Sequence, residues 1–379
     1  MKYLMSNPGK FHHFEVAREL FKKNQLNKII CGYPWFKLKH EGVDKDKIIS
    51  LSLITILTRF IKVRKITDFL NDYQSKKIDL EAGKFLDNSN VFIGLSTCGL
   101  KTGIEAKKRG IVYICERSSA HIKYQNEILK REYEKLKLSY QPIPKERIER
   151  EIDEYNESDF ILVPSSFVKK TFENYGYSKA KVLKFGSNLS SFYPIKQIKK
   201  DDRAFEILFV GQISIQKGIH YLLEAFKKFK HPFKKLHIVG SKTQDNKYFF
   251  NKFIDKDIII HGHMNHLNLN KLMNQCHVIV LPSIQDGFGL VVSQAAAAGC
   301  PSIVSENTGA ADFVRDSKGG MVVKSGDSNL ITEKFELFSE DKYLLETLAS
   351  NALKFSQSNP WENYVLELNK LVIEYLNRN

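Results

Sequence analysis

The sequence lacks the features that mark secreted and membrane-spanning proteins. Its five cysteines are scattered, odd in number and without a CxxC pair, which is typical of a reducing cytosol rather than of a disulfide framework. No stretch of about 18 apolar residues occurs, and the opening MKYLMSNPGK contains no apolar run long enough for a signal peptide. We therefore expect a cytoplasmic protein, either soluble or peripheral on the inner face of a membrane.

Several nucleotide- and nucleic-acid-binding signatures are also missing. The chain contains neither GxGxxG nor GxxxxGKS/T, which argues against dinucleotide oxidoreductases and P-loop proteins. It has no zinc-finger spacing, no RRM or KH signature and no basic–aromatic strip, which argues against a nucleic-acid partner. The net charge of +15, from 58 basic and 43 acidic residues, then points to an anionic membrane surface or an anionic substrate.

Metal-binding patterns are weak. The DxD-like pairs at 44–46 and 255–257 lie in lysine-rich turns, where acidic residues are ordinary surface groups. His261, His263 and His266 could ligate zinc, but no cysteine or carboxylate completes an evident set. We expect no metal and no resident cofactor.

The sequence contains two series of short apolar strands that alternate with helices. A length of 379 residues predicts about two domains. The expected strands are at 2–5, 29–32, 91–94, 111–115, 160–164 and 182–185, then at 206–210, 236–239, 257–260, 278–281, 302–304 and 321–323. The polar stretch 194–204 is the best linker. This pattern predicts an α/β protein with two Rossmann-like, doubly wound domains facing a cleft, at 1–195 and 196–360, and an amphipathic helix within 361–379.

Residues 51–70 are predicted to form a strongly apolar helix with Arg59, Lys62 and Lys65 along one flank. One interpretation is a core helix with a solvated basic edge. The other is a helix that docks on a membrane and attracts anionic lipid.

The stretch 278–305 carries the clearest sign of a ligand site. VIVLPS and PSIVS are buried strands, and between them Gly287 and Gly289 let the backbone approach a ligand before a helix that ends at Gly299. The free N–H groups at the start of that helix favour an anion. Asp286 and Gln294 could reach the same ligand, although they could also be a helix-end acid and a plain polar residue. The combination indicates a nucleotide-sugar site.

A second loop, in FVGQISIQKG, places Lys217 at the start of a helix that follows the strand at 206–210. Open parallel sheets bind ligands at the carboxyl ends of their strands, so we expect Lys217 to point into the cleft. A lysine beside a helix N-terminus is suited to neutralise a diphosphate. The alternative is a surface lysine in a turn.

Polar residues of the first half are expected at the same cleft. Glu116, Arg117 and His121 follow the strand at 111–115, where Arg117 could bind anions and His121 could bond near a transferred sugar. They could instead serve as a helix cap and a buried, satisfied histidine. His12 and His13 follow the first glycine loop, in which Gly9 lies, and either line the cleft or simply begin a helix.

These motifs resemble the retaining glycosyltransferases of family 4 (group 1), which have the GT-B fold. PSIQDGFGLVVSQAAAAGCP is similar to the family's signature, FVGQISIQKGIHYLLEAF to its diphosphate-binding loop, and EYNESDFILVPSSFVKKTFENYG to the last segment of its acceptor domain. ERSSAHIKYQ is similar to a stretch of a bacterial subgroup. The helix from Trp361 resembles the one that crosses back to the first domain. The resemblance covers most of the chain.

The resemblance implies transfer of a sugar from a nucleotide-sugar donor (UDP-, GDP- or ADP-sugar) to a glycan or lipid-linked acceptor, without a metal. The implied sites are catalytic residues His121, Lys217 and Asp286; donor residues Gly9, Gly211, Gln212, Lys217, Asp286, Gly287, Phe288, Gly289, Leu290, Val291 and Gln294; and acceptor residues Glu116, Arg117, His12 and His13. Asp286 and Gln294 replace the family's paired glutamates, and Gln212 replaces a frequent arginine. The alternatives are a sucrose- or glycogen-synthase-like enzyme with a soluble acceptor, and a catalytically silent scaffold.

Overall fold

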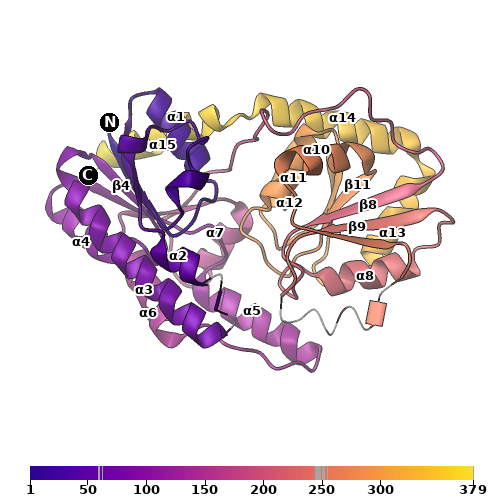
Figure 1. Ribbon diagram of the computed structural model, residues 1–379, viewed down its shortest axis with the longest axis horizontal. Helices are drawn as coiled ribbons and strands as arrows, with labels where there is room; N and C mark the ends of the chain where they lie inside the picture. The colour runs from indigo at the N-terminus through magenta and orange to yellow at the C-terminus, as the bar shows by residue number, and fades with distance from the viewer. Residues whose placement is uncertain (59, 62, 244–248, 250–251, 254, 379) are drawn as a thin grey trace.

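The computed structural model describes the whole chain except residues 59, 62, 244–248, 250–251, 254 and 379. Two α/β domains lie side by side, the first mainly in indigo to magenta and the second from salmon pink through orange to yellow (Figure 1). Each is built on one parallel sheet, so the predicted fold class is confirmed. The central strand VIVL at 278–281 is a continuous apolar run, because helices cover both faces of the sheet.

The first sheet has, among the described residues, seven strands in the order β3-β2-β1-β4-β5-β6-β7. Their bounds are β1 Tyr3–Asn7, β2 Leu26–Cys31, β3 Ile48–Ser50, β4 Val91–Leu95, β5 Val112–Glu116, β6 Phe160–Val163 and β7 Ala180–Val182. The order reverses between β1 and β4, which pair in parallel. In such sheets the ligand crevice lies outside the carboxyl ends of the strands at this reversal.

Helices cover this sheet on both faces. They are α1 His13–Lys22, α2 Leu53–Thr58, α3 Arg64–Ala82, α4 Leu100–Lys108, α5 Ile122–Lys135, α6 Lys145–Glu157 and α7 Ser166–Glu173, with short 3-10 helices at Trp35–Lys37, Lys45–Lys47 and Gly83–Asn88. Alternate residues of β1 point to opposite faces. Tyr3 and Met5 pack in the same core cluster as α1, and Leu4 packs in the cluster of α4 and α7.

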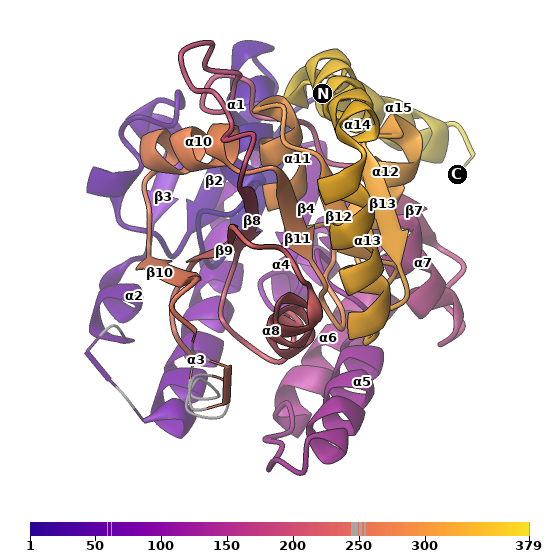
Figure 2. The same ribbon diagram turned by 90° about the vertical axis from the view of Figure 1, so that its right-hand side faces the viewer.

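The second sheet has, within the described ranges, six strands in the order β10-β9-β8-β11-β12-β13. They are β8 Phe205–Val210, β9 Lys234–Val239, β10 Ile258–Gly262, β11 Val278–Leu281, β12 Ser302–Ser305 and β13 Gly320–Val323, and the helices are α8 Ile219–Lys228, α10 His266–Gln275, α11 Leu290–Ala297, α12 Ala310–Ser317, α13 Ser328–Glu340 and α14 Lys342–Ser358. Figure 2 shows α8 and α13 on one side of this sheet and α10 and α11 on the other. The order reverses between β8 and β11, which sets the second crevice there.

The last helix, α15 (Trp361–Leu376), returns to the first domain and packs against α1 (Figure 1). Its buried residues recur at helical spacing on one face: Trp361, Tyr364, Val365, Leu368 and Val372. They share the first domain's core with Tyr3 and Phe14. This is the place that the resemblance implies for the helix.

Two of the expected elements differ from the structure. The single helix at 51–70 is wrong, because α2 ends at Thr58 and α3 begins at Arg64. Of its predicted basic flank, Arg59 and Lys62 lie outside the described residues, as does the side chain of Lys65. The strand expected at 182–185 is β7, which instead spans Ala180–Val182, because these are the residues that pair with β6. No helix in the described ranges is both long and apolar enough to cross a bilayer.

Candidate active site

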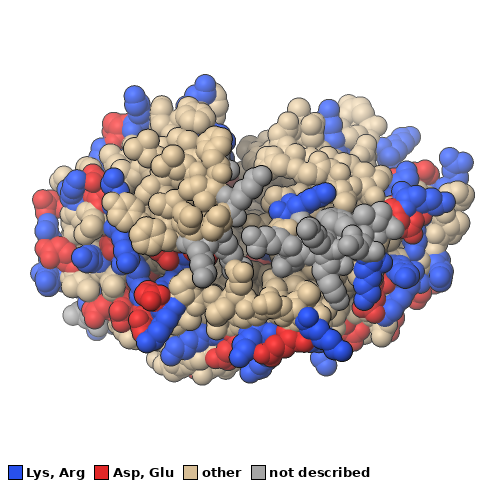
Figure 3. All heavy atoms as spheres, turned by 60° about the horizontal axis from the view of Figure 1, so that its bottom comes forward, with Lys and Arg blue, Asp and Glu red and all other residues tan. Residues whose placement is uncertain are grey.

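A cavity of about 810 Å³ lies between the two domains, where the two crevices face each other. The first domain lines it with the loops after β1, β4 and β5, and the second with the loops after β8 and β11. The volume falls within the roughly 300–1,000 Å³ of small-molecule and cofactor sites. Figure 3 shows acidic and basic side chains mixed over both domains on one face, so the excess positive charge does not form a single patch there.

Lys217 reaches this cavity beside Asp286. The loop after β8 ends at Gly218, which takes a left-handed conformation (φ 67°) and caps α8. A Cβ on Gly218 would lie 1.9 Å from the carbonyl oxygen of Pro282, so the loops after β8 and β11 pack directly on one another. Lys217 Nζ therefore lies 2.5 Å from Asp286 Oδ2. An anionic ligand would meet a lysine that already has a carboxylate partner.

The glycine loop packs against the first domain. A Cβ on Gly287 would lie 1.8 Å from the carbonyl oxygen of Ser118, and the Ser165 hydroxyl donates to the carbonyl oxygen of Gly287 at 2.9 Å. Gly289 is left-handed (φ 77°) and begins α11, whose first residues Leu290 and Val291 line the cavity. The structure is thus closed, with backbone of the two domains in contact beside the cavity.

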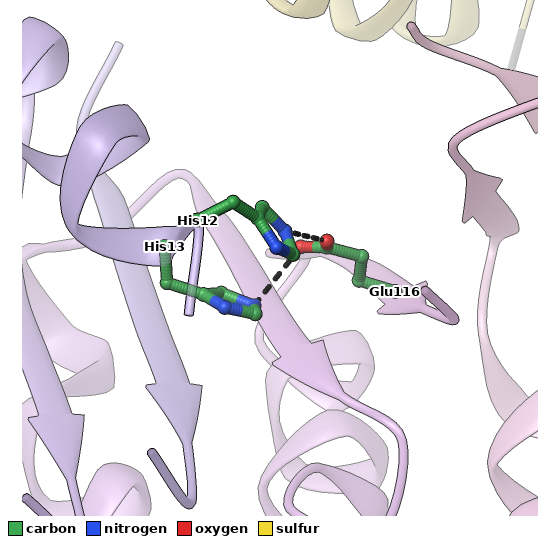
Figure 4. Close-up of side chains that lie close together, drawn as sticks. All are labelled: His12, His13 and Glu116. Carbon is green, nitrogen blue, oxygen red and sulfur yellow. Dashed lines mark hydrogen bonds and ion pairs between the residues drawn. The ribbon is translucent and has the colours of Figure 1, made fainter. Parts of the chain in front are cut away.

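Two histidines and a glutamate of the first domain form a buried cluster (Figure 4). His12 Nε2 makes a hydrogen bond with Glu116 Oε1, and His13 Nε2 lies 3.2 Å from Glu116 Oε2. The Ser118 hydroxyl also donates to Glu116, at 3.1 Å. Although burial opposes ionisation, the two histidines hold the pKa of Glu116 well below its usual range. Burial lowers the pKa of His12, although the neighbouring Glu116 raises it.

Most of the predicted site residues meet at this cavity. The predicted residues that line it are His12, His13, Arg117, Gly211, Lys217, Asp286, Phe288, Gly289, Leu290 and Val291. Glu116 and Gly287 lie directly behind the lining, in contact with His12 and Ser118 respectively. The roles of these residues stay predictions. Their proximity was expected, because they follow the carboxyl ends of four strands, β1, β5, β8 and β11.

His121 is placed elsewhere, which corrects its prediction as a catalytic residue in the cleft. Its ring is fully buried and stacks on Tyr175 with 4.2 Å between centroids. Tyr155 and Phe172 close around the same ring. Burial and the charge of Arg117 lower the pKa of His121 to about 3, so it is a neutral core residue. The ring is buried, as the alternative expected, but neither of its nitrogens has a hydrogen-bond partner among the described residues, so it is not the satisfied histidine of that alternative.

Three predicted donor residues also lie outside the lining of the cavity. Gln294 is partly buried on α11, and Gly9 lies beneath the ring of Phe11. Gln212 lines a neighbouring cavity of about 470 Å³ instead. The prediction that all three contact the donor is therefore not supported by this conformation.

Arg117 lines the cavity, but its guanidinium is occupied by protein acceptors. It donates to Gln125 Oε1 at 2.7 Å, to Ser96 Oγ at 3.2 Å and to the carbonyl oxygen of Ala120 at 3.2 Å. It also pairs with the buried carboxylate of Glu151 at 3.1 Å. Arg117 is therefore better suited to hold the β5 loop in place than to bind an anion.

Sequence reasoning missed Phe185, which lines the cavity just after β7. Its ring stacks on the His12 ring with 4.0 Å between centroids. It also packs on the ring of Phe288 from the other domain, with 4.8 Å between centroids. An aromatic residue at a strand's carboxyl end, in KVLKFG, was the available signal. Phe185 connects the histidine cluster to the glycine loop.

The comparisons with known proteins agree with the fold. Residues 194–355, which include the second domain, match the family described as glycosyl transferases group 1. This match supports a transferase activity. The capsular polysaccharide biosynthesis glycosyltransferase CapM of Staphylococcus aureus is 32% identical over 169 residues, which are 42% of this chain and 44% of CapM. The chain spans about half of the length of the curated relatives it matches.

Two solved structures are similar over their whole length. Sucrose-phosphate synthase from Thermosynechococcus elongatus has a TM-score of 0.74 at 17% identity and covers 100% of both chains. Anabaena HepE, solved in complex with UDP-glucose, has a TM-score of 0.70 at 15% identity and covers 99% of this chain and 100% of its own. At these identities the likeness establishes the GT-B fold alone.

Proposed function

We propose that the protein is a retaining glycosyltransferase that moves a sugar from a nucleotide-sugar donor to a glycan or lipid-linked acceptor in the cytoplasm. The observation that carries the proposal is the cavity between the domains, which Lys217 and the start of α11 line together with loops of the first domain. A lysine and free N–H groups at a helix N-terminus can neutralise a departing diphosphate without a metal. HepE, which shares the fold, binds UDP-glucose.

The class of acceptor is proposed from the relatives. CapM acts in capsular polysaccharide biosynthesis, and another relative, 25% identical over 177 residues, is an N-acetylgalactosaminyltransferase of Campylobacter jejuni named for a diphospho-undecaprenol acceptor. A cell-surface glycan built on a lipid carrier would require the acceptor to be reached at a membrane. The alternative is a soluble acceptor, as for a glycogen synthase, which the tests below would favour if the protein does not bind membranes.

Donor binding should raise the melting temperature of the protein. A ligand that binds only the folded state at 100 times its Kd stabilises it by about 2.7 kcal/mol. We therefore expect one class among UDP-, GDP- and ADP-sugars to shift the thermal unfolding transition by several degrees. The measurement is a thermal-shift screen with matched free nucleotides. If no donor shifts the melting temperature, the proposed enzymatic function is contradicted and a catalytically silent scaffold is favoured.

An apolar ridge on the first domain supports contact with a membrane. Its exposed side chains belong to α2, α3 and the turn between them: Leu53 is 76% exposed, Leu57 56%, Phe60 81% and Phe69 69%. Soluble monomers rarely gather so many large apolar side chains without a partner. Because Thr55 of α2 and Asp68 and Asp72 of α3 line the cavity, the ridge adjoins the acceptor side of the site.

Polar substitutions on the ridge should weaken membrane binding. We expect the variant Leu57→Ser/Phe60→Ser/Phe69→Ser to bind phosphatidylglycerol vesicles about tenfold more weakly in a flotation assay, because apolar insertion drives such binding. Tyr343→Ser is the matched control, since Tyr343 is 81% exposed on the second domain. Equal binding by wild type and the triple variant would remove the membrane from the proposal.

A further inference from the structure

A cluster of possible metal ligands lies in the second domain, away from the cavity. It consists of Glu206, His237 and Cys276, whose three ligand atoms lie within 4.8 Å of one another. Glu206 is the second residue of β8, His237 is in the middle of β9, and Cys276 lies just before β11. The cavity is lined by loops that follow β8 and β11, and by none of these three residues. The cluster is therefore separate from the candidate active site.

The pairing of the strands brings these residues onto one face of the second sheet. β8 lies between β9 and β11 and pairs with both. His237 pairs with Leu208, which is two residues after Glu206, so these side chains point to the same face. Cys276 packs on this face with Leu208 and with Met273 of α10. Because the ligands come from different strands, their spacing in the sequence gave no sign of the cluster.

The spacing between Glu206 and His237 suits a metal ion. His237 Nε2 lies 3.5 Å from Glu206 Oε2. Two ligands that are each about 2.1 Å from a tetrahedral ion lie about 3.4 Å apart, whereas hydrogen-bonded N and O atoms lie roughly 2.7–3.2 Å apart. His237 is 7% exposed, and its Nε2 is buried without a hydrogen-bond partner among the described residues. A metal ion would satisfy this nitrogen.

Neighbouring side chains orient both ligands. His237 Nδ1 lies 2.9 Å from His261 Nε2, and this hydrogen bond leaves Nε2 of His237 directed at Glu206. Lys235 Nζ donates to Glu206 Oε1 at 3.4 Å, which leaves Oε2 for the cluster. Outer partners of this kind fix the ring and the carboxylate of metal ligands in proteins. The third ligand, Cys276, is a free and fully buried thiol.

The histidine cluster at the cavity has a different geometry. Its three residues, His12, His13 and Glu116, form the other group of three possible ligands that the described residues contain. However, His12 Nε2 and Glu116 Oε1 are in direct hydrogen-bond contact, which leaves no space for an ion between them. The cluster of the second domain is therefore the better metal site.

We propose that Glu206, His237 and Cys276 bind one zinc ion through Oε2, Nε2 and Sγ. Carboxylate, imidazole and thiolate are ligands of zinc, whereas a thiolate does not suit magnesium or calcium. The thiol proton is released to solvent when the ion binds. The Glu206 side chain is 16% exposed, so the ion enters from the surface and a water molecule completes its tetrahedral set. The ion ties β9 and the start of β11 to β8 and stabilises the second domain.

The test measures zinc bound by the full chain, prepared without a histidine tag. The protein is treated with EDTA, freed of the chelator, supplied with zinc sulfate and passed through a desalting column. We expect mass spectrometry of the metal to find about one zinc per chain, and zinc to raise the melting temperature by several degrees over EDTA. Cobalt in place of zinc should give a thiolate-to-cobalt charge-transfer band and the visible bands of a tetrahedral ion.

Substitution of single ligands locates the ion. Cys276→Ser and His237→Gln should each lose the bound zinc and the difference in melting temperature between zinc and EDTA. Cys300→Ser is the matched control, because Cys300 is equally buried in the same core cluster but contacts only the backbone carbonyl oxygens of Cys276 and Pro301. It should bind zinc as wild type does. Each variant is compared with itself in zinc and in EDTA, so a general loss of stability does not imitate lost binding.

Three results would overturn the zinc site. The first is a wild type that binds no zinc and melts at the same temperature in zinc and in EDTA. The second is zinc that both Cys276→Ser and His237→Gln retain. The third is zinc that His12→Asn loses and Cys276→Ser keeps, which would place the ion at the cavity. These measurements do not involve sugar transfer, so none of the three results affects the proposed function.

Discussion

Lys217→Ala is expected to weaken binding of the donor nucleotide about a hundredfold. Lys217 is the cationic side chain of the β8 loop at the cavity, and its removal would leave the Asp286 carboxylate unpaired opposite an incoming diphosphate. Charge-assisted contacts to phosphate are among the strongest in proteins, and a hundredfold loss corresponds to about 2.7 kcal/mol. The measurement is isothermal titration of the nucleotide selected by the thermal-shift screen.

A double variant distinguishes lost attraction from new repulsion. Lys217→Ala/Asp286→Asn should bind the nucleotide about tenfold better than Lys217→Ala alone, because no uncompensated carboxylate remains. Lys227→Ala is the control, since Lys227 is exposed in the last turn of the same helix, α8. Undiminished nucleotide binding by Lys217→Ala would show that the donor diphosphate lies elsewhere.

The architecture could be predicted from the sequence because parallel strands buried on both faces must be short apolar runs. VIVL of β11 and FILV of β6 could be recognised in this way. The edge strand β3 was missed, since Ile48–Ser50 is three residues long and only its first residue is buried. The break between α2 and α3 was missed because an apolar pattern continues through residues 51–70, whereas α2 ends at Thr58 and α3 begins at Arg64.

The second-domain side of the site was more predictable than the first. Lys217 and Asp286 lie in loops whose glycines limit the possible geometry, and both reach the cavity. The histidines could not be ranked from the sequence, because each follows a strand and precedes a helix. Packing distinguishes them: aromatic rings enclose His121, whereas His12 has a carboxylate on one nitrogen and the cavity beside it.

Polar contacts between residues that do not line the cavity also join the two domains. Asp312 of α12 accepts a hydrogen bond from the backbone of Ser166 at 2.7 Å. Glu132 of α5 accepts from Tyr221 at 2.6 Å and contacts His220 at 2.9 Å, both on α8. With the contact between Gly287 and the first domain, they hold the two domains together beside the cavity, so transfer should depend on how closely the domains can approach.

Gly287→Ala should prevent this closure. The added Cβ would lie 1.8 Å from the carbonyl oxygen of Ser118 and 3.0 Å from Ser119 Cα, so backbone atoms of the other domain would have to move. Overpacking of this kind typically costs about 1–3 kcal/mol, and separating the domains relieves it. We expect kcat to fall about a hundredfold, because small displacements of a catalytic group have effects of this size. Nucleotide binding by the second domain should change much less.

A matched substitution shows whether the effect is closure or stability. Gly83→Ala also adds one methyl group, but its Cβ would meet only Thr102 Oγ1, at an ordinary 3.4 Å. It should leave kcat unchanged. Small-angle scattering should give a larger radius of gyration for Gly287→Ala than for wild type or Gly83→Ala, with similar melting temperatures. A fully active Gly287→Ala variant of unchanged radius would mean that the observed contact between Gly287 and Ser118 is not required for transfer, and that the working site is more open than the structure.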